Sequence, residues 1–150
     1  MKISSTALAV LVCFCASAAA QDSGKAPPTD TRPCMANFAV EGSFITGKTF
    51  RTWQEHSGVN YDVAFRKTAQ AVAGAGWGSV NSNKDTGTIT ALQEVTGSRR
   101  KSSAPLNAII QEKGKEVIRV DVNFSITGGQ VTPEDTAKAE LCKVVEAASK

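Results

Sequence analysis

The only histidine of the chain, His56, directly follows Glu55. An imidazole and a carboxylate can carry out general acid–base catalysis when both reach the same proton. Consecutive residues of an extended chain point to opposite sides, so these two side chains do not face each other on a strand. Ser43, Ser57 and Ser79 could approach the imidazole in space, but no Gly-x-Ser-x-Gly elbow marks any of them as an activated nucleophile. We therefore predict a surface histidine at a strand end, no catalytic residue and no enzymatic activity.

The acidic residues are scattered along the chain. They include Asp62, Asp85, Asp121, Glu134, Asp135 and Glu140. No Asp-x-Asp-x-Asp loop of the calcium-binding type is present, and no cluster has the spacing of zinc ligands. Glu134 and Asp135 are explained by a helix start, where acidic side chains favour the positive end of the helix dipole. The sequence predicts no metal site and no cofactor.

Two tryptophans and one basic run are the remaining candidates for a binding surface. We interpret Trp53 and Trp77 as core residues packed under the helices, with a ligand or partner surface as the alternative. Arg99-Arg100-Lys101 lies in a polar stretch and is interpreted as a solvated loop. Contact of this run with acidic lipid headgroups is the alternative, and three charges are too few to be diagnostic.

Two short motifs match known patterns by their letters alone. Gln70-Ala71-Val72-Ala73-Gly74 matches Gln-x-Val-x-Gly, the inhibitory loop pattern of cystatins. That loop must project from a hairpin, whereas here the five residues end a predicted helix, so cystatin-like protease inhibition is a remote alternative. Asn123-Phe124-Ser125 is an N-glycosylation sequon, which has meaning only in a eukaryotic host.

Residues 1–20 have the pattern of a cleavable secretory signal, with Lys2, a short apolar stretch and an alanine-rich end. We expect cleavage after Ala20. A transmembrane anchor is the alternative, but serine and threonine dilute the uncharged run. A lipoprotein signal is disfavoured because bulky Phe14 precedes Cys15, where such signals require a small residue. The sequence thus predicts an exported protein, periplasmic or secreted, that does not span a membrane after cleavage.

Cleavage would remove Cys13 and Cys15 and leave Cys34 and Cys142. Two cysteines in an exported chain predict one disulfide, here closing a loop of about a hundred residues. In the chain-entropy model such a loop adds roughly 4–5 kcal/mol to the free energy of unfolding. Two unpaired thiols would require a reducing compartment, and the missing Cys-x-x-Cys spacing argues against a redox-active pair.

Length and composition indicate a single folded domain. The chain has 150 residues, 41% of them hydrophobic, with 17 Lys and Arg against 14 Asp and Glu. This mixed charge argues against a nucleic-acid binder. Three prolines and little apolar mass make residues 21–33 a flexible linker. We predict one α+β domain over residues 34–150.

The hydrophobic pattern predicts five strands and two helices. The expected strands cover residues 38–53, 77–82, 88–95, 106–112 and 117–126. One helix follows a cap at Asn60, and the second opens at Thr132-Pro133 with Thr132 as its cap. The order β-α-β-β-β-β-α and the short loops predict a two-layer α+β fold, an antiparallel sheet of about five strands with both helices on one face. That face would be the one presented by Ile118, Val120, Val122 and Phe124.

Part of this pattern resembles a known group of domains. An alanine-rich helix, the step Gly76-Trp77 into a strand, and Asp85-x-Gly87-x-Ile89 before the next strand resemble the helix-grip or TATA-box-binding-protein-like domains of small bacterial envelope proteins and lipoproteins. The accessory lipoproteins of the outer-membrane β-barrel assembly machinery are an example. The resemblance covers about half of the chain after the signal and implies a non-enzymatic accessory role, without carrying over any site residue. The missing lipid-acceptor cysteine is a departure from that group.

These observations predict a non-enzymatic, exported domain that binds a protein or a cell-envelope component in an accessory or scaffolding role. Its partner would be an envelope protein or a lipid, and the segment 88–95 could add a partner strand as an exposed edge. The alternative is a carrier of a small molecule or lipid, with a pocket between the C-terminal helix and the sheet. Leu141, Val144, Val122 and Phe124 would line that pocket.

Overall fold

The computed structural model describes residues 30–95 and 102–150. The predicted signal at 1–20, most of the linker 21–33 and the Arg99-Arg100-Lys101 run lie outside the described residues. The elements, in chain order, are α1 (Pro33–Ala36), β1 (Ala39–Ser43), β2 (Gly47–Ser57), α2 (Tyr61–Gly74), β3 (Gly78–Asn83), β4 (Thr88–Val95), β5 (Ser102–Gly114), β6 (Val117–Ile126) and α3 (Glu134–Glu146), followed by a 3-10 turn at Ala147–Ser149.

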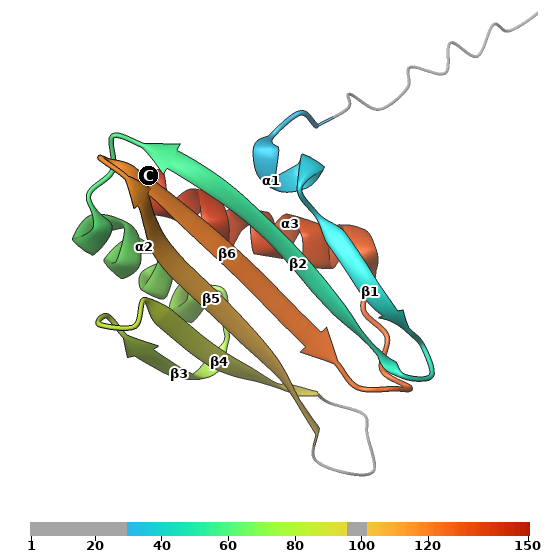
Figure 1. The fold of residues 1–150 in the computed structure, drawn as a ribbon. Helices are drawn as coiled ribbons and strands as arrows, with labels where there is room; N and C mark the ends of the chain where they lie inside the picture. Colours follow the sequence, from blue (N-terminus) through green and yellow to red (C-terminus); the bar gives the residue numbers. More distant parts are fainter. Residues whose placement is uncertain (1–29, 96–101) are drawn as a thin grey trace, which may run out of the picture.

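The strands form one antiparallel sheet in the order β1-β2-β6-β5-β4-β3, and α2 and α3 lie behind it in Figure 1. The predicted α+β class and antiparallel sheet are confirmed, but the sheet has six strands rather than five. The expected strand 38–53 is a hairpin of β1 and β2. Gly42 and Gly47 at its turn have φ of +95° and +97°, and a Cβ on Gly42 would lie 2.1 Å from the carbonyl oxygen of Gly47. Only glycine fits such a close approach at that φ.

The helices also differ in detail from the prediction. Asn60 caps α2 as expected, its side chain accepting a hydrogen bond of 2.8 Å from the backbone N–H of Asp62. For α3, the prediction of a Thr132 cap is wrong, because Pro133 occupies the cap position and makes no side-chain capping bond. A third helix, α1, has four residues and a proline at its start. It was not predicted because one helical turn shows no periodicity.

The core lies between the sheet and the helices. Along β6, buried and half-buried residues alternate strictly, and the buried set begins at Ile118 and ends at Ile126. These residues join Phe50 of β2 and Leu141 of α3 in one cluster. The alternation confirms the predicted face, since a pleated strand sends every second side chain to the same side.

A disulfide joins Cys34 of α1 to Cys142 of α3, with Cα atoms 5.4 Å apart, and confirms the predicted pairing. Both cysteines are fully buried and lie 108 residues apart in sequence. The bond holds the start of the described chain against the last helix. In the part of the chain that the structure describes, no helix is long and apolar enough to cross a bilayer.

The sheet has its edges at β1 and β3, so the expectation that 88–95 forms an exposed edge is wrong. β4 lies between β3 and β5. The edge strand next to β4, β3, is exposed along its length and has a bulge between Gly78 and Asn81, with Ser79 at φ 47°. Bulged, twisted edges disfavour the addition of a further strand.

Candidate functional site

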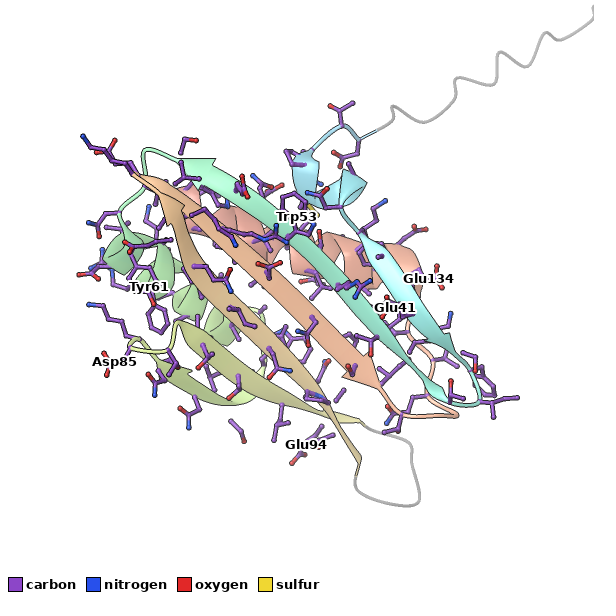
Figure 2. The ribbon with its side chains drawn as sticks, in the orientation of Figure 1. Glu41, Trp53, Tyr61, Asp85, Glu94 and Glu134 are labelled. Atoms are coloured by element: carbon purple, nitrogen blue, oxygen red, sulfur yellow. A yellow bond between two sulfur atoms is a disulfide. The ribbon has the colours of Figure 1, made fainter. Side chains whose placement is uncertain are left out.

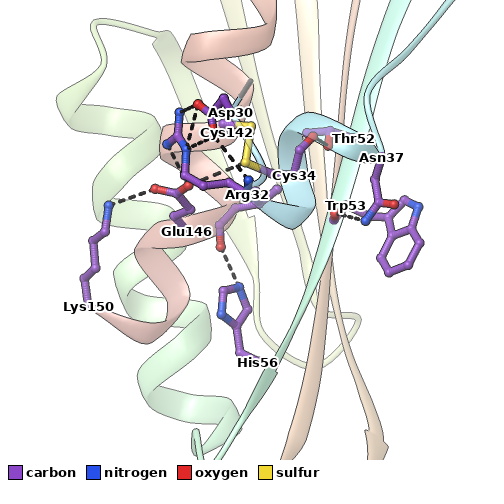
Figure 3. Close-up of a disulfide and its surroundings, with 11 residues drawn as sticks. Asp30, Arg32, Cys34, Asn37, Thr52, Trp53, His56, Cys142, Glu146 and Lys150 are labelled. Carbon is purple, nitrogen blue, oxygen red and sulfur yellow. Dashed lines mark hydrogen bonds and ion pairs between the residues drawn. A yellow bond between two sulfur atoms is a disulfide. The ribbon is translucent and has the colours of Figure 1, made fainter. Parts of the chain in front are cut away.

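His56 is not part of a surface site, because its side chain lies on the helix side of the sheet. Its side chain is 5% exposed, faces the helices, and its Nε2 donates a hydrogen bond of 2.8 Å to the carbonyl oxygen of Val145 (Figure 3). The prediction of a surface histidine is therefore wrong. Burial lowers the pKa of His56, against a smaller opposing effect of the Val145 bond, which keeps the ring neutral near pH 7. Glu55, the residue before His56, is exposed and points to the other side of β2, as expected for consecutive residues of a strand.

Near the disulfide, Glu146 joins the N-terminal segment to α3 by ion pairs. Its carboxylate lies 2.7 Å from Arg32 and 3.0 Å from Lys150 (Figure 3). Burial would raise the pKa of Glu146, but the hydrogen bonds from Lys150 and Arg32 outweigh it and hold this pKa below its ordinary value. Arg32 also pairs with Asp30 at 2.7 Å. These contacts fasten the chain beside the buried disulfide and have a structural role.

The face of the sheet opposite the helices carries a ladder of polar side chains (Figure 2). Strand register places Arg51 of β2 opposite Asn123 of β6, and Asn123 opposite Asn107 of β5. Asn107 donates a hydrogen bond of 3.2 Å from Nδ2 to Oδ1 of Asn123. One row along, the hydroxyls of Thr49 and Ser125 are 3.0 Å apart. Neighbouring strands thus hold these side chains at fixed spacings.

Trp53 lies in this polar face, so its predicted position under the helices is wrong. The Arg119 guanidinium carbon is 4.0 Å from the centre of the indole ring, which is the geometry of a cation–π contact. Arg119 in turn donates two hydrogen bonds, of 2.8 and 2.7 Å, to the carboxylate of Asp121. These bonds raise the pKa of Arg119 and keep the guanidinium charged. The other tryptophan, Trp77, packs edge-on against Phe124 at 5.2 Å and confirms its predicted core contact.

A hollow of about 440 Å³ lies beside Trp53, between the N-terminal segment, β2 and β6. Its lining residues are Asn37, Ala39, Arg51, Thr52, Trp53, Arg119, Asp121, Val122 and Asn123. Asn37 donates a hydrogen bond of 3.0 Å to the carbonyl oxygen of Trp53, which ties the segment after α1 to β2. Arg51 is ion-paired with Glu41 on β1. The hollow therefore combines one aromatic ring, two amide side chains and two guanidinium groups that each have a carboxylate partner.

A second hollow, also of about 440 Å³, lies at the start of α2. It is lined by Tyr61, Asp62, Lys84, Asp85, Thr86, Ile110 and Glu112. The Tyr61 hydroxyl donates a hydrogen bond of 2.7 Å to the carbonyl oxygen of Lys84, whose ammonium lies 2.9 Å from Asp62. Burial, followed by the charge of Glu112, raises the pKa of Tyr61, so the hydroxyl stays protonated. The Lys84 and Asp62 side chains are more than half exposed, so this hollow lacks a rigid polar frame.

The structure also shows where the possible metal ligands, the Gln-x-Val-x-Gly match and the expected carrier-pocket residues lie. Within residues 30–95 and 102–150, no three His, Cys, Asp or Glu side chains lie close enough together to hold a metal ion. Gln70-Ala71-Val72-Ala73-Gly74 is the last part of α2 with Val72 fully buried, so it does not project as an inhibitory loop. The side chains expected to line a carrier pocket are packed in the core cluster; they are Leu141, Val144, Val122 and Phe124.

The sequence did not predict the hollow beside Trp53. It joins residues 37–39, 51–53 and 119–123, which only the pairing of β2 with β1 and β6 brings together. The signal that the sequence offers is the polar set on 117–126, where Arg119, Asp121 and Asn123 alternate with the apolar residues.

Comparisons with known proteins give only distant structural likenesses. No family model matches the chain, and no curated protein matches its sequence. Among solved structures, CalU16 from Micromonospora echinospora is similar at 11% identity and a TM-score of 0.44, over 75% of this chain and 95% of that one. EF2215 from Enterococcus faecalis, described as a conserved protein of unknown function, is similar at 8% identity and a TM-score of 0.46, over 75% and 76%.

Proposed function

We propose that this chain is a non-catalytic, exported domain that binds a component of the cell envelope through the polar face of its sheet. The observation that carries the proposal is the Trp53 hollow on the face opposite the helices. There Arg119 and Asp121 are fixed by two mutual hydrogen bonds beside the indole ring. A partly buried aromatic ring framed by ordered polar groups is typical of binding surfaces, since it offers apolar area and directional bonds together.

Export is supported by two independent features of the chain. The residues 1–20 have the composition of a secretory signal, and the disulfide between Cys34 and Cys142 is of a kind that persists in oxidising compartments. The non-catalytic part of the proposal is supported by the position of the imidazole. His56 is turned into the core and hydrogen-bonded to a backbone carbonyl. Glu55 lies on the other face of the sheet, so the two side chains do not form an acid–base pair.

Binding is tested with the protein recovered from its host and a washed envelope fraction from the same cells. We expect the protein to co-sediment with the envelope, and Trp53→Ala to reduce the bound fraction by roughly tenfold. Val80→Ala, at an exposed position of the edge strand β3, is the matched control and should bind like wild type. Equal co-sedimentation of wild type and W53A would contradict the proposal.

Export is tested on the same purified protein by mass spectrometry. We expect an N-terminus at Gln21 and resistance of Cys34 and Cys142 to alkylation until a reductant is added. Recovery of an intact Met1 from a reducing compartment, with both thiols freely alkylated, would overturn this part of the proposal.

A further inference from the structure

We propose that the Trp53 hollow binds a neutral oligosaccharide. This inference rests on the proposed function and names the class of envelope component that this site recognises. It follows from three properties of the hollow: its charges, its amides and its aromatic ring.

The charges of the hollow favour a neutral ligand. Arg119 is held by Asp121 through two hydrogen bonds, and Arg51 is ion-paired with Glu41. An anionic ligand would have to displace these carboxylates or lie beside them, and like charges at that range repel. Phosphate or carboxylate groups are therefore poor ligands here, although two arginines line the hollow.

The amides supply the bonds that sugar hydroxyls make. Each hydroxyl both donates and accepts hydrogen bonds, and an amide side chain offers two N–H groups and two lone pairs. Asn37 and Asn123 line the hollow, and Asn107, opposite Asn123 on the adjoining strand β5, is hydrogen-bonded to it. That bond takes one N–H of Asn107 and one lone pair of Asn123, so both groups retain capacity for a ligand.

The indole of Trp53 supplies an apolar surface for a sugar ring. A pyranose with equatorial hydroxyls presents a flat face of C–H groups, which can stack on an aromatic ring while its hydroxyls lie at the rim. Arg119 covers one face of the indole, so the ligand would stack on the other face. Figure 3 shows the Trp53 ring on the opposite side of β2 from His56 and the disulfide. The volume of about 440 Å³ lies in the range of small-ligand sites.

Nucleic acids and peptides fit this surface less well. A nucleobase can stack on tryptophan, but binding of its phosphates requires cations without a carboxylate partner. A peptide adding to the sheet would require a long, regular edge strand, whereas the edge strand β3 is bulged and the edge strand β1 has five residues.

The test is a titration with cellotetraose, chitotetraose and maltotetraose in the Trp77→Phe background, where Trp53 is the remaining tryptophan and reports binding by its fluorescence. We expect at least one of the three to give a saturable change in emission, confirmed by calorimetry. Its affinity should change less than twofold between about 0.05 and 0.5 M salt, because no ion pair forms with the ligand. No saturable binding of any of the three overturns the inference.

Variants on the polar face of the sheet make the test specific. Calorimetry with Trp53→Ala should show a loss of affinity of roughly tenfold or more, as expected for a lost stacking platform. Asn123→Ala should lose several-fold, whereas Asn81→Ala, exposed on β3 and farther along the same ladder, should bind like wild type. Unfolding curves of all three variants verify that they are folded. Equal affinity of W53A and wild type for the sugar overturns the inference.

Envelope co-sedimentation separates this inference from the proposed function. If periodate treatment of the envelope abolishes binding and protease treatment does not, the glycan assignment is supported. If protease abolishes binding and periodate has no effect, the partner is a protein, so the glycan inference fails while the proposed function stands. If the untreated envelope does not bind, both fail.

Discussion

The two faces of the sheet are made by the same strands but differ in what they contact: one packs against the helices, and the other carries the polar side chains around Trp53. On β2, Phe50 and Thr52 are buried against the helices, while Arg51 and Trp53, which alternate with them, belong to the polar face. If the proposed function holds, alternate residues of one strand serve stability and binding separately. A substitution at a helix-facing position should lower the free energy of unfolding, and one on the polar face should change binding alone. The following predictions test this separation, beginning with the largest effect.

Removal of the disulfide on the helix side should have the largest effect. We expect Cys34→Ala with Cys142→Ala to lower the free energy of unfolding by about 4–5 kcal/mol, since the bond closes a loop across 108 residues. Urea denaturation measures the change, and the wild type treated with a reductant is the control. A loss below about 1 kcal/mol would show that the unfolded chain gains little freedom when the bond is absent.

Substitutions of two neighbouring residues of β2 compare how much each face contributes to the free energy of unfolding. Phe50→Ala should cost about 3–5 kcal/mol, because it leaves a cavity among fully buried side chains. Arg51→Ala should cost less than about 1 kcal/mol, because its ion pair with Glu41 is exposed. Urea denaturation of both variants gives the difference. Similar losses in the two would mean that the polar face also carries stability.

The pH dependence of stability should come partly from His56. Its pKa in the folded state is below the ordinary value of 6.5, so as pH falls through about 6.5 the unfolded chain takes up a proton that the folded chain does not. Stability from this residue is therefore complete above pH 6.5, decreases below it, and stops decreasing below the folded pKa. His56→Gln keeps a donor for Val145 but does not titrate. Denaturation at several pH values should show a steeper fall for wild type, and parallel curves would contradict the assignment.

On the polar face, Arg119→Ala should have the smallest effect on stability. We expect a loss below about 1 kcal/mol, because the guanidinium is partly exposed and its cation–π contact and ion pair are surface interactions. The same variant should weaken binding to the envelope fraction, since it removes the group that holds Asp121 beside Trp53. A large loss of stability with unchanged binding would reverse the assignment of the two faces.

Much of the fold could be predicted because its signals are local. The period of two along 117–126 and the Asn60 cap each lie in a short stretch of sequence, and both predictions were confirmed. The pairing of Cys34 with Cys142, 108 residues apart, was also confirmed, and it could be predicted because no other cysteine follows residue 20. The number of strands was not predicted correctly, because a sequence with two glycines is compatible both with a hairpin turn and with an interrupted single strand. The Trp53 hollow could not be predicted, since its parts are some 70 residues apart along the chain.

The amino-acid sequence by itself determined that this chain forms an antiparallel sheet with helices on the face of Ile118, because apolar residues on β6 occupy every second position. On β2 it did not determine which face is buried, since both alternate sets mix polar and apolar residues: Phe50 and His56 in one, Trp53 and Glu55 in the other. Only the pairing of Phe50 with Phe124 and of His56 with Ile118 decided that His56 goes inside and Trp53 outside. The physical reason is that a shift of one residue in register exchanges the two faces of a strand, and register depends on the neighbouring strand as well as on the strand itself.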